Sequence, residues 1–152
     1  MFKLNTDEIE FIKTNEIKFK EYLGKKSDYY LSAWTIKPKY NMASAFGGVF
    51  WFGYRGMFLS LFVIFILFII FDLFLLLTGI PYIKSINYGF LALYGIVGNY
   101  LFYYKVKNNI KKDKKPTNPF LGVFVAFIMF CFWFFISILL EETVFNIILL
   151  NY

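Results

Sequence analysis

The apolar run from residue 57 to residue 80 constrains the fold of this chain more than any other feature. It reads MFLSLFVIFILFIIFDLFLLLTGI and holds one charged residue, Asp72. A helix over this range would be about 36 Å long at 1.5 Å per residue, and the hydrocarbon core of a bilayer is about 30 Å thick. The run therefore predicts a transmembrane helix, and Pro81 is expected to end it.

Two further apolar runs predict two more spans. Residues 120–140 are almost entirely apolar, and residues 88–104 form a shorter run rich in Gly and Tyr. Across the 152 residues, 59% are hydrophobic and 24% aromatic, which is more apolar surface than a soluble domain of this size can bury. The predicted fold class is an all-α integral membrane protein with three transmembrane helices, at about 57–80, 88–104 and 120–140.

Residues 1–41 form a polar N-terminal segment, and residues 42–152 form the membrane domain. Thr6, followed by two acids, is typical of a helix start, and Gly24 is typical of a helix end. This amphipathic helix either lies on the membrane surface or packs on the rest of the protein. Its apolar face, interrupted by Glu16, consists of Ile9, Ile12, Phe19 and Leu23.

Residues 42–56 predict a short helix that is interfacial or re-entrant. The apolar part is too short for an ordinary span, and three glycines weaken it as a helix. Trp51 and Tyr54 are residue types that favour the membrane–water interface. The alternative is that this segment crosses the membrane as a fourth span, which would place the lysine-rich N-terminus outside.

The distribution of lysine predicts the orientation. The segment 105–119 carries six Lys and one Asp, and positively charged loops stay in the cytoplasm. The N-terminus is then cytoplasmic and the C-terminus lies outside. The formal net charge of +6 predicts anionic lipid headgroups as partners and, in the absence of any nucleic-acid-binding motif, no nucleic acid.

The rarity of reactive side chains argues against an enzyme. The chain has no His and one Cys, Cys131, which lies in an apolar run. A His-based triad, an intrachain disulfide and a Cys-based zinc site are therefore excluded. We expect no catalytic residues, no metal and no cofactor.

Three polar positions are candidates for a functional role. Arg55 is the only arginine, and with Trp51 and Tyr54 it is expected to contact lipid headgroups or a protein partner. Asp72 lies about 22 Å into the first span, where a carboxylate is costly. It marks either a transport site or a hydrated helix end, and in the second case replacing Asp72 by Leu should give a mild gain in stability.

Asn99 lies in the second predicted span and is expected to form a contact between helices. It shares a helical face with the small residues Ala92 and Gly95, which favour close approach of a neighbouring helix. Asn99 is also a possible partner for Arg55. Gly122 and Ala126 predict a second contact of this kind in the third span.

One stretch resembles a known family. Residues 41–58 are similar to the pattern N-W-A-A-F-x-x-G-P-F-W-x-x-Y-R-K-M-Y of small bacterial inner-membrane proteins grouped as "domain of unknown function 2628". The resemblance spans about residues 20–108, with further similar elements at 24–30 and 98–104, and it implies a location in the bacterial inner membrane. Departures include Ser44, Val49, Gly56 and Phe58, and the matching positions are Asn41, Ala43, Gly48, Phe50, Trp51, Tyr54, Arg55 and Met57.

Three functions are compatible with these observations. The first is a non-enzymatic accessory, assembly or regulatory protein that acts on a membrane protein partner or as a homo-oligomer. The second is an oligomeric component of ion- or proton-coupled transport, based on Asp72 and Asn99. The third is a membrane-inserted immunity or defence protein, for which the sequence offers no specific motif.

Overall fold

The computed structural model describes residues 2–79 and 85–150, and every regular element in these ranges is a helix. The all-α class predicted from the sequence is therefore confirmed. In chain order the elements are α1 (Thr6–Thr14), α2 (Glu16–Leu23), the 3-10 turn η1 (Gly24–Lys26), α3 (Ser27–Thr35), α4 (Met42–Tyr54), α5 (Phe58–Thr78), α6 (Ser85–Lys111) and α7 (Pro119–Leu150).

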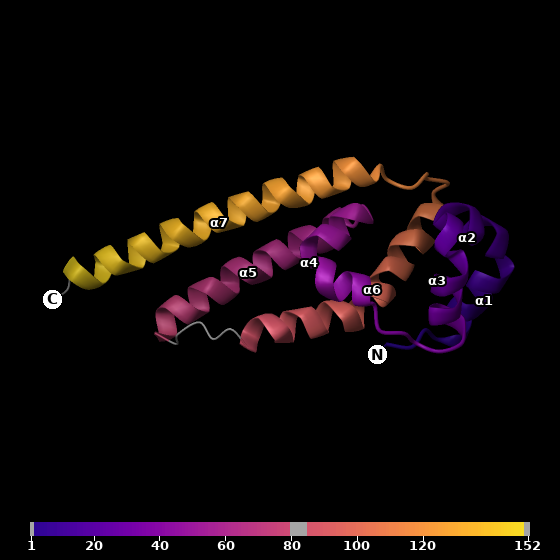
Figure 1. Ribbon diagram of the computed structural model, residues 1–152, viewed down its shortest axis with the longest axis horizontal. Coiled ribbons are helices and arrows are strands. Elements are labelled where there is room, and N and C mark those ends of the chain that lie inside the picture. The colour runs from indigo at the N-terminus through magenta and orange to yellow at the C-terminus, as the bar shows by residue number, and fades with distance from the viewer. Residues whose placement is uncertain (1, 80–84, 151–152) are drawn as a thin grey trace.

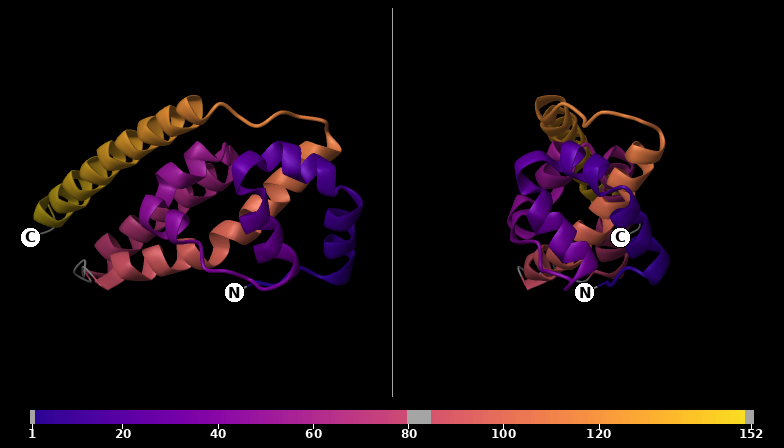
Figure 2. Two further views of the ribbon diagram at one scale, coloured as in Figure 1. Left: turned by 45° about the vertical axis from the view of Figure 1, so that its right-hand side comes forward. Right: turned by 90° about the vertical axis from the view of Figure 1, so that its right-hand side faces the viewer.

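The helices divide the molecule into two ends. Helices α5 and α7 extend side by side in the same direction, and α6 begins nearer the far end of α5 and runs back to the N-terminal helices (Figure 1). Helices α1–α3 gather around the C-terminal part of α6, and the segment that joins α6 to α7 begins at the same end (Figure 2). The lysine-rich parts of the chain therefore lie together, away from the far ends of α5 and α7.

The polar N-terminal segment folds into several short helices that pack on the protein. The side chain of Asn5 caps α1 by accepting a hydrogen bond from the backbone N–H of Glu8 at 2.9 Å, one residue before the predicted start at Thr6. Asn15 divides the single predicted helix into α1 and α2, and Gly24, with φ 59°, ends α2 as predicted. The apolar face is buried against α3 and α6 and includes Ile12, Phe19 and Leu23.

An ion pair ties α1 to α6. The Lys107 ammonium donates a hydrogen bond to the Glu8 carboxylate at 2.5 Å, and the Tyr103 hydroxyl donates another. Burial by itself raises the pKa of Glu8, but these hydrogen bonds and the nearby lysine charges together lower that pKa below its ordinary value. The N-terminal helices are therefore held to α6 by a charged contact as well as by apolar packing.

Helix α4 lies at the centre of the molecule and contacts α5, α6 and α7. The Asn41 side chain caps its start by accepting a hydrogen bond from the Ser44 backbone N–H at 2.9 Å. At Gly48 the backbone takes φ 48° and ψ −135°, a conformation that side chains with a Cβ disfavour, and the helix kinks there. The predicted short helix at 42–56 is thus present as two helical pieces joined at Gly48.

Small residues allow α4 to approach α7 closely. A Cβ atom on Gly53 would collide with the carbonyl oxygen of Gly122, and one on Gly122 would collide with that of Gly53. Ala126, which is only 1% exposed, lies beside the same glycine of α4. The contact predicted at Gly122 and Ala126 is therefore found. On α6, Gly95 lies close to Tyr40 and Gly98 lies close to Ser44. Ala92 is exposed, so its inclusion in the predicted contact face was wrong.

Two helices of the described residues are long and apolar enough to cross a membrane: α5 over Phe58–Thr78 and α7 over Pro119–Thr143. They correspond to the predicted spans 57–80 and 120–140. The third predicted span, 88–104, lies within α6, which is not among the helices that meet this criterion in the described ranges. Helix α5 ends at Gly79, with φ 66°, and Pro81 lies outside the described residues.

Candidate functional site

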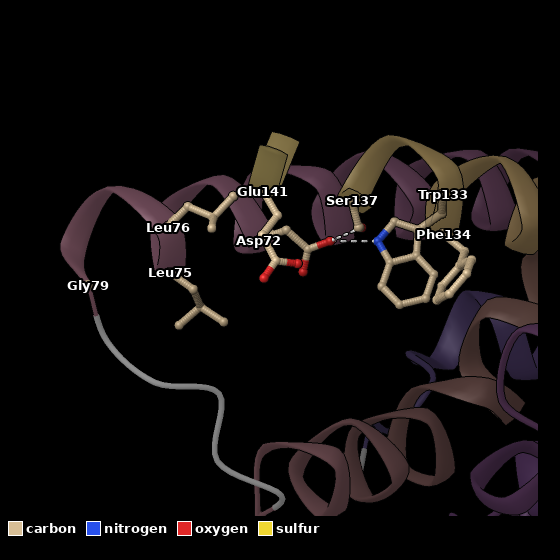
Figure 3. A pocket seen from close by; sticks show the side chains of 8 residues that line it. All are labelled: Asp72, Leu75, Leu76, Gly79, Trp133, Phe134, Ser137 and Glu141. Atoms are coloured by element: carbon tan, nitrogen blue, oxygen red, sulfur yellow. Dashed lines mark hydrogen bonds between the residues drawn. The ribbon is translucent and has the colours of Figure 1, made fainter. Parts of the chain in front are cut away.

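The carboxylate of Asp72 joins α5 to α7. The indole Nε1–H of Trp133 donates a hydrogen bond to Asp72 Oδ2 at 2.8 Å, and the hydroxyl of Ser137 donates to the same oxygen at 2.6 Å (Figure 3). Trp133 and Ser137 are four residues apart and therefore occupy one face of α7. The costly charge of Asp72 is thus compensated by two donors from the neighbouring helix.

A cavity of about 530 Å³ opens beside this cluster. Its wall contains Asp72 and Ser137, the apolar side chains Leu75 and Leu76, and Gly79 at the end of α5. The cavity therefore reaches from the Asp72 carboxylate to the end of its helix, a distance of about 10 Å along seven residues. Water entering from that end would hydrate the carboxylate.

Glu141 adds a second carboxyl group to the same cavity. It lies one turn beyond Ser137 on α7, so that Trp133, Ser137 and Glu141 follow one another at intervals of four residues (Figure 3). Two carboxyl groups beside an apolar wall can hold a proton or a monovalent cation. Within the described ranges, no three His, Cys, Asp or Glu side chains come together as they do in a metal site.

The sequence identified Asp72 but missed its partners on α7. Trp133 and Ser137 lie in the predicted span 120–140, and Glu141 follows it directly. The spacing of these three residues was a usable signal, because a polar stripe at intervals of four on an otherwise apolar helix faces one neighbour. What the sequence did not contain was the register between α5 and α7, which places the stripe opposite Asp72.

Arg55 lies in a cage of aromatic side chains. Its guanidinium group donates a hydrogen bond to the hydroxyl of Tyr30 at 2.6 Å. Its central carbon lies between 4.9 and 5.9 Å from the ring centroids of Tyr30, Trp51, Tyr54 and Phe102. This distance range is that of cation–π contacts, which stabilise a guanidinium group without a carboxylate partner.

The three predicted interface residues differ in exposure. Trp51 is 6% exposed and belongs to the core, Tyr54 is 49% exposed, and Arg55 is partly buried between them. Tyr30 and Phe102, which complete the cage, come from α3 and α6 and could not be assigned to it from the local sequence.

Asn99 fixes the segment before α4 onto α6. Its amide nitrogen donates to the Lys39 carbonyl oxygen at 2.9 Å, and its amide oxygen accepts a hydrogen bond from Asn41 at 2.8 Å. The Trp34 indole donates to the Asn99 backbone carbonyl at 2.8 Å. Asn99 thus forms a contact between elements, as expected. It does not pair with Arg55, because the hydrogen bond of Arg55 goes to Tyr30.

A family model described as "Protein of unknown function (DUF2628)" matches residues 3–108. The chain belongs to the DUF2628 family. No curated protein and no solved structure is significantly similar to the chain.

The DUF2628 match has a clear structural extent. It covers α1 to α5 and most of α6, and it ends before α7. Asn41, Gly48 and Arg55, which carry the resemblance, respectively cap α4, kink α4 and fill the aromatic cage. The Asp72 cluster depends on α7 and therefore combines one residue of the matched region with residues outside it.

Proposed function

We propose that the protein is a multi-pass protein of the bacterial inner membrane, in which α5, α7 and the N-terminal part of α6 cross the bilayer. The exposed apolar surface of α5 and α7 carries this proposal, because only 6% of each spanning window is buried inside the protein. Water does not tolerate so large a continuous apolar surface, whereas lipid does. The lysine-rich end, with the N-terminus, faces the cytoplasm, and the C-terminus lies outside.

Within the membrane the protein acts without catalysis, as an accessory, assembly or regulatory partner of another membrane protein or of its own copies. The contacts of its polar side chains support this role. Asp72 accepts hydrogen bonds from two donors on α7, Arg55 contacts four aromatic rings including that of Tyr30, and Asn99 fixes the segment before α4. Each of these groups holds helices together, and the packed cytoplasmic end offers a stable surface to a partner.

Two matched substitutions test the membrane location. Leu67 near the middle of α5 is 56% exposed, and Ile17 on α2 is 75% exposed. If α5 faces lipid, Leu67→Arg should reduce the membrane-inserted yield strongly, since an arginine at the centre of a span costs about 2.5–3.5 kcal/mol. Ile17→Arg should insert like the wild type. Equal yields of both variants in alkali-washed membranes would contradict the proposal.

A second candidate, a step of proton- or cation-coupled transport, is favoured by the cavity that Asp72 and Glu141 share. If the protein carries out such a step, proteoliposomes should show a flux that Asp72→Asn and Glu141→Gln both abolish. Glu142→Gln, which removes the same charge from the next residue, is the matched control and should retain the flux. Absence of any wild-type flux would remove this candidate and leave the accessory role.

A further inference from the structure

A second cavity, of about 440 Å³, lies between η1, α3 and the start of α4. Its volume falls within the range of about 300–1,000 Å³ that is typical of small-molecule sites. Its wall includes Lys25, Lys26, Tyr29, Tyr30, Tyr40 and Met42. None of these residues belongs to the Asp72 cavity at the far end of α5, so the two cavities are separate sites.

The charge around this cavity is positive. Among the described residues the ion pairs are Lys20 with Glu16 and Lys107 with Glu8, so the ammonium groups of Lys25 and Lys26 have no carboxylate partner there. The nearest acid in the sequence, Asp28, does not line the cavity.

Arg55 adds to this positive charge from behind the wall. Tyr30 lines the cavity and accepts the hydrogen bond from the Arg55 guanidinium at 2.6 Å. The Arg55 Nε atom is buried and has no hydrogen-bond partner among the described residues. Two lysines line the cavity, the Arg55 guanidinium lies behind Tyr30, and no acid is among the lining residues; this arrangement of charge favours a phosphate group.

The surface next to the cavity is apolar. Met42 at its edge is 59% exposed, and Phe46, one helical turn along α4 and before the kink at Gly48, is 76% exposed. A free phosphate ion gains nothing from these two side chains. A phospholipid gains from both features, because its phosphate meets the lysines while an acyl chain covers the exposed side chains.

The position of α4 in the fold agrees with a lipid ligand. Helix α4 ends at Tyr54, just before α5 begins at Phe58, and it crosses α7 at Gly53 and Gly122, close to the start of that helix. Its C-terminal end therefore lies at the end of the two apolar helices where the lysine-rich segments gather, and Lys25 and Lys26 of the cavity wall belong to these segments (Figure 2). Headgroups of the cytoplasmic leaflet would lie at this level.

We propose that this cavity binds the phosphate headgroup of an anionic phospholipid, with Lys25 and Lys26 contacting the phosphate and Met42 and Phe46 contacting an acyl chain. The site rests on the membrane location proposed above and makes it more specific. It also gives a role to the residues around 24–30 and 41–43, which belong to two of the stretches that carry the family resemblance.

Native mass spectrometry of the full-length protein tests the site. The protein is released from micelles that contain equal amounts of phosphatidylglycerol and phosphatidylcholine, and the retained lipids are counted. The wild type should retain phosphatidylglycerol in preference. The double variant Lys25→Gln/Lys26→Gln should lower that preference about thirtyfold, since each lysine near an anionic surface contributes about fivefold. The control Lys13→Gln/Lys112→Gln removes the same charge elsewhere and should cause a much smaller loss.

Each other outcome overturns the proposal. Equal retention of the two lipids by the wild type, or equal losses in the two double variants, would show that the cavity does not select a headgroup. If inorganic phosphate displaces phosphatidylglycerol at micromolar concentration, the ligand is a soluble phosphate compound. Absence of a lipid preference in a wild-type protein whose membrane location the Leu67 and Ile17 variants support counts against this site and leaves the membrane location intact.

Discussion

The hydrogen bonds between Asp72 and α7 give the sharpest energetic prediction. Hydrogen bonds between transmembrane helices average about 0.6 kcal/mol and reach about 1.7 kcal/mol. The bond from Ser137 is 2.6 Å long and charge-assisted, so its contribution should lie in the upper part of this range, at about 1 kcal/mol. Asp72→Leu also removes a charge that costs up to about 2.5–3.5 kcal/mol at mid-span. The two effects oppose each other, so the net stability of Asp72→Leu alone is not diagnostic.

A double-mutant cycle separates these effects. The free energy of unfolding is measured in mixed detergent micelles for the wild type, Asp72→Leu, Ser137→Ala and the double variant, and the coupling energy should be about 1 kcal/mol. Thr143→Ala is the matched control, because the Thr143 hydroxyl donates to Leu139 in its own helix at 2.7 Å and should be additive with Asp72→Leu. Additivity of Asp72 and Ser137 within about 0.3–0.5 kcal/mol would refute the proposed contact.

Three further predictions concern other contacts. Arg55→Ala should lower the free energy of unfolding by about 1–3 kcal/mol, and Arg55→Lys should lower it by less, because Lys keeps the charge but loses the planar stacking. Equal thermal stability of the wild type and the two variants would exclude a structural role of Arg55. Gly122→Ala should destabilise the protein by about 1–3 kcal/mol through its collision with α4, whereas Gly89→Ala, where nothing lies within 4 Å, should not. The pKa of Glu8 is lowered in the folded protein, so its contact with α6 stabilises the fold fully at pH values above 4.5, the ordinary pKa, and this contribution is lost as the pH falls through the lowered pKa. The melting temperature of Glu8→Gln should therefore depend less on pH between 7 and 3 than that of the wild type or of Glu10→Gln.

The helical class and several helix ends could be predicted because local residues determine them. Gly24 ends α2 through its positive φ as predicted, and α4 begins at Met42, the first residue of the predicted helix 42–56. The break at Asn15 was not predicted, because the apolar face continues across it; there the Asn15 side chain donates a hydrogen bond to the Phe11 carbonyl oxygen at 3.0 Å. Local signals therefore fixed where helices begin and end but not how many pieces a polar segment forms.

The candidate site was predicted only in part, because its partners come from distant segments. Arg55 was identified by its rarity, but Tyr30 and Phe102 reach it from helices that are far away in the sequence. If Asp72 is only a hydrated helix end, replacement by Leu is expected to give a mild gain in stability. The two donors from α7 add an opposing cost that the sequence did not reveal. Register between helices is a tertiary property, and a single sequence does not encode it visibly.

The central claim is tested most directly by measuring on which side of the membrane the two ends of α7 lie. In a Cys131→Ser background, Lys112→Cys marks the segment between α6 and α7, and Asn151→Cys marks the C-terminus. A membrane-impermeant maleimide added to intact spheroplasts should label Asn151→Cys alone, and Lys112→Cys should react only after the membrane is opened. Labelling of both positions in intact spheroplasts, or of neither until the membrane is opened, would contradict a chain that crosses the bilayer with its lysine-rich end inside.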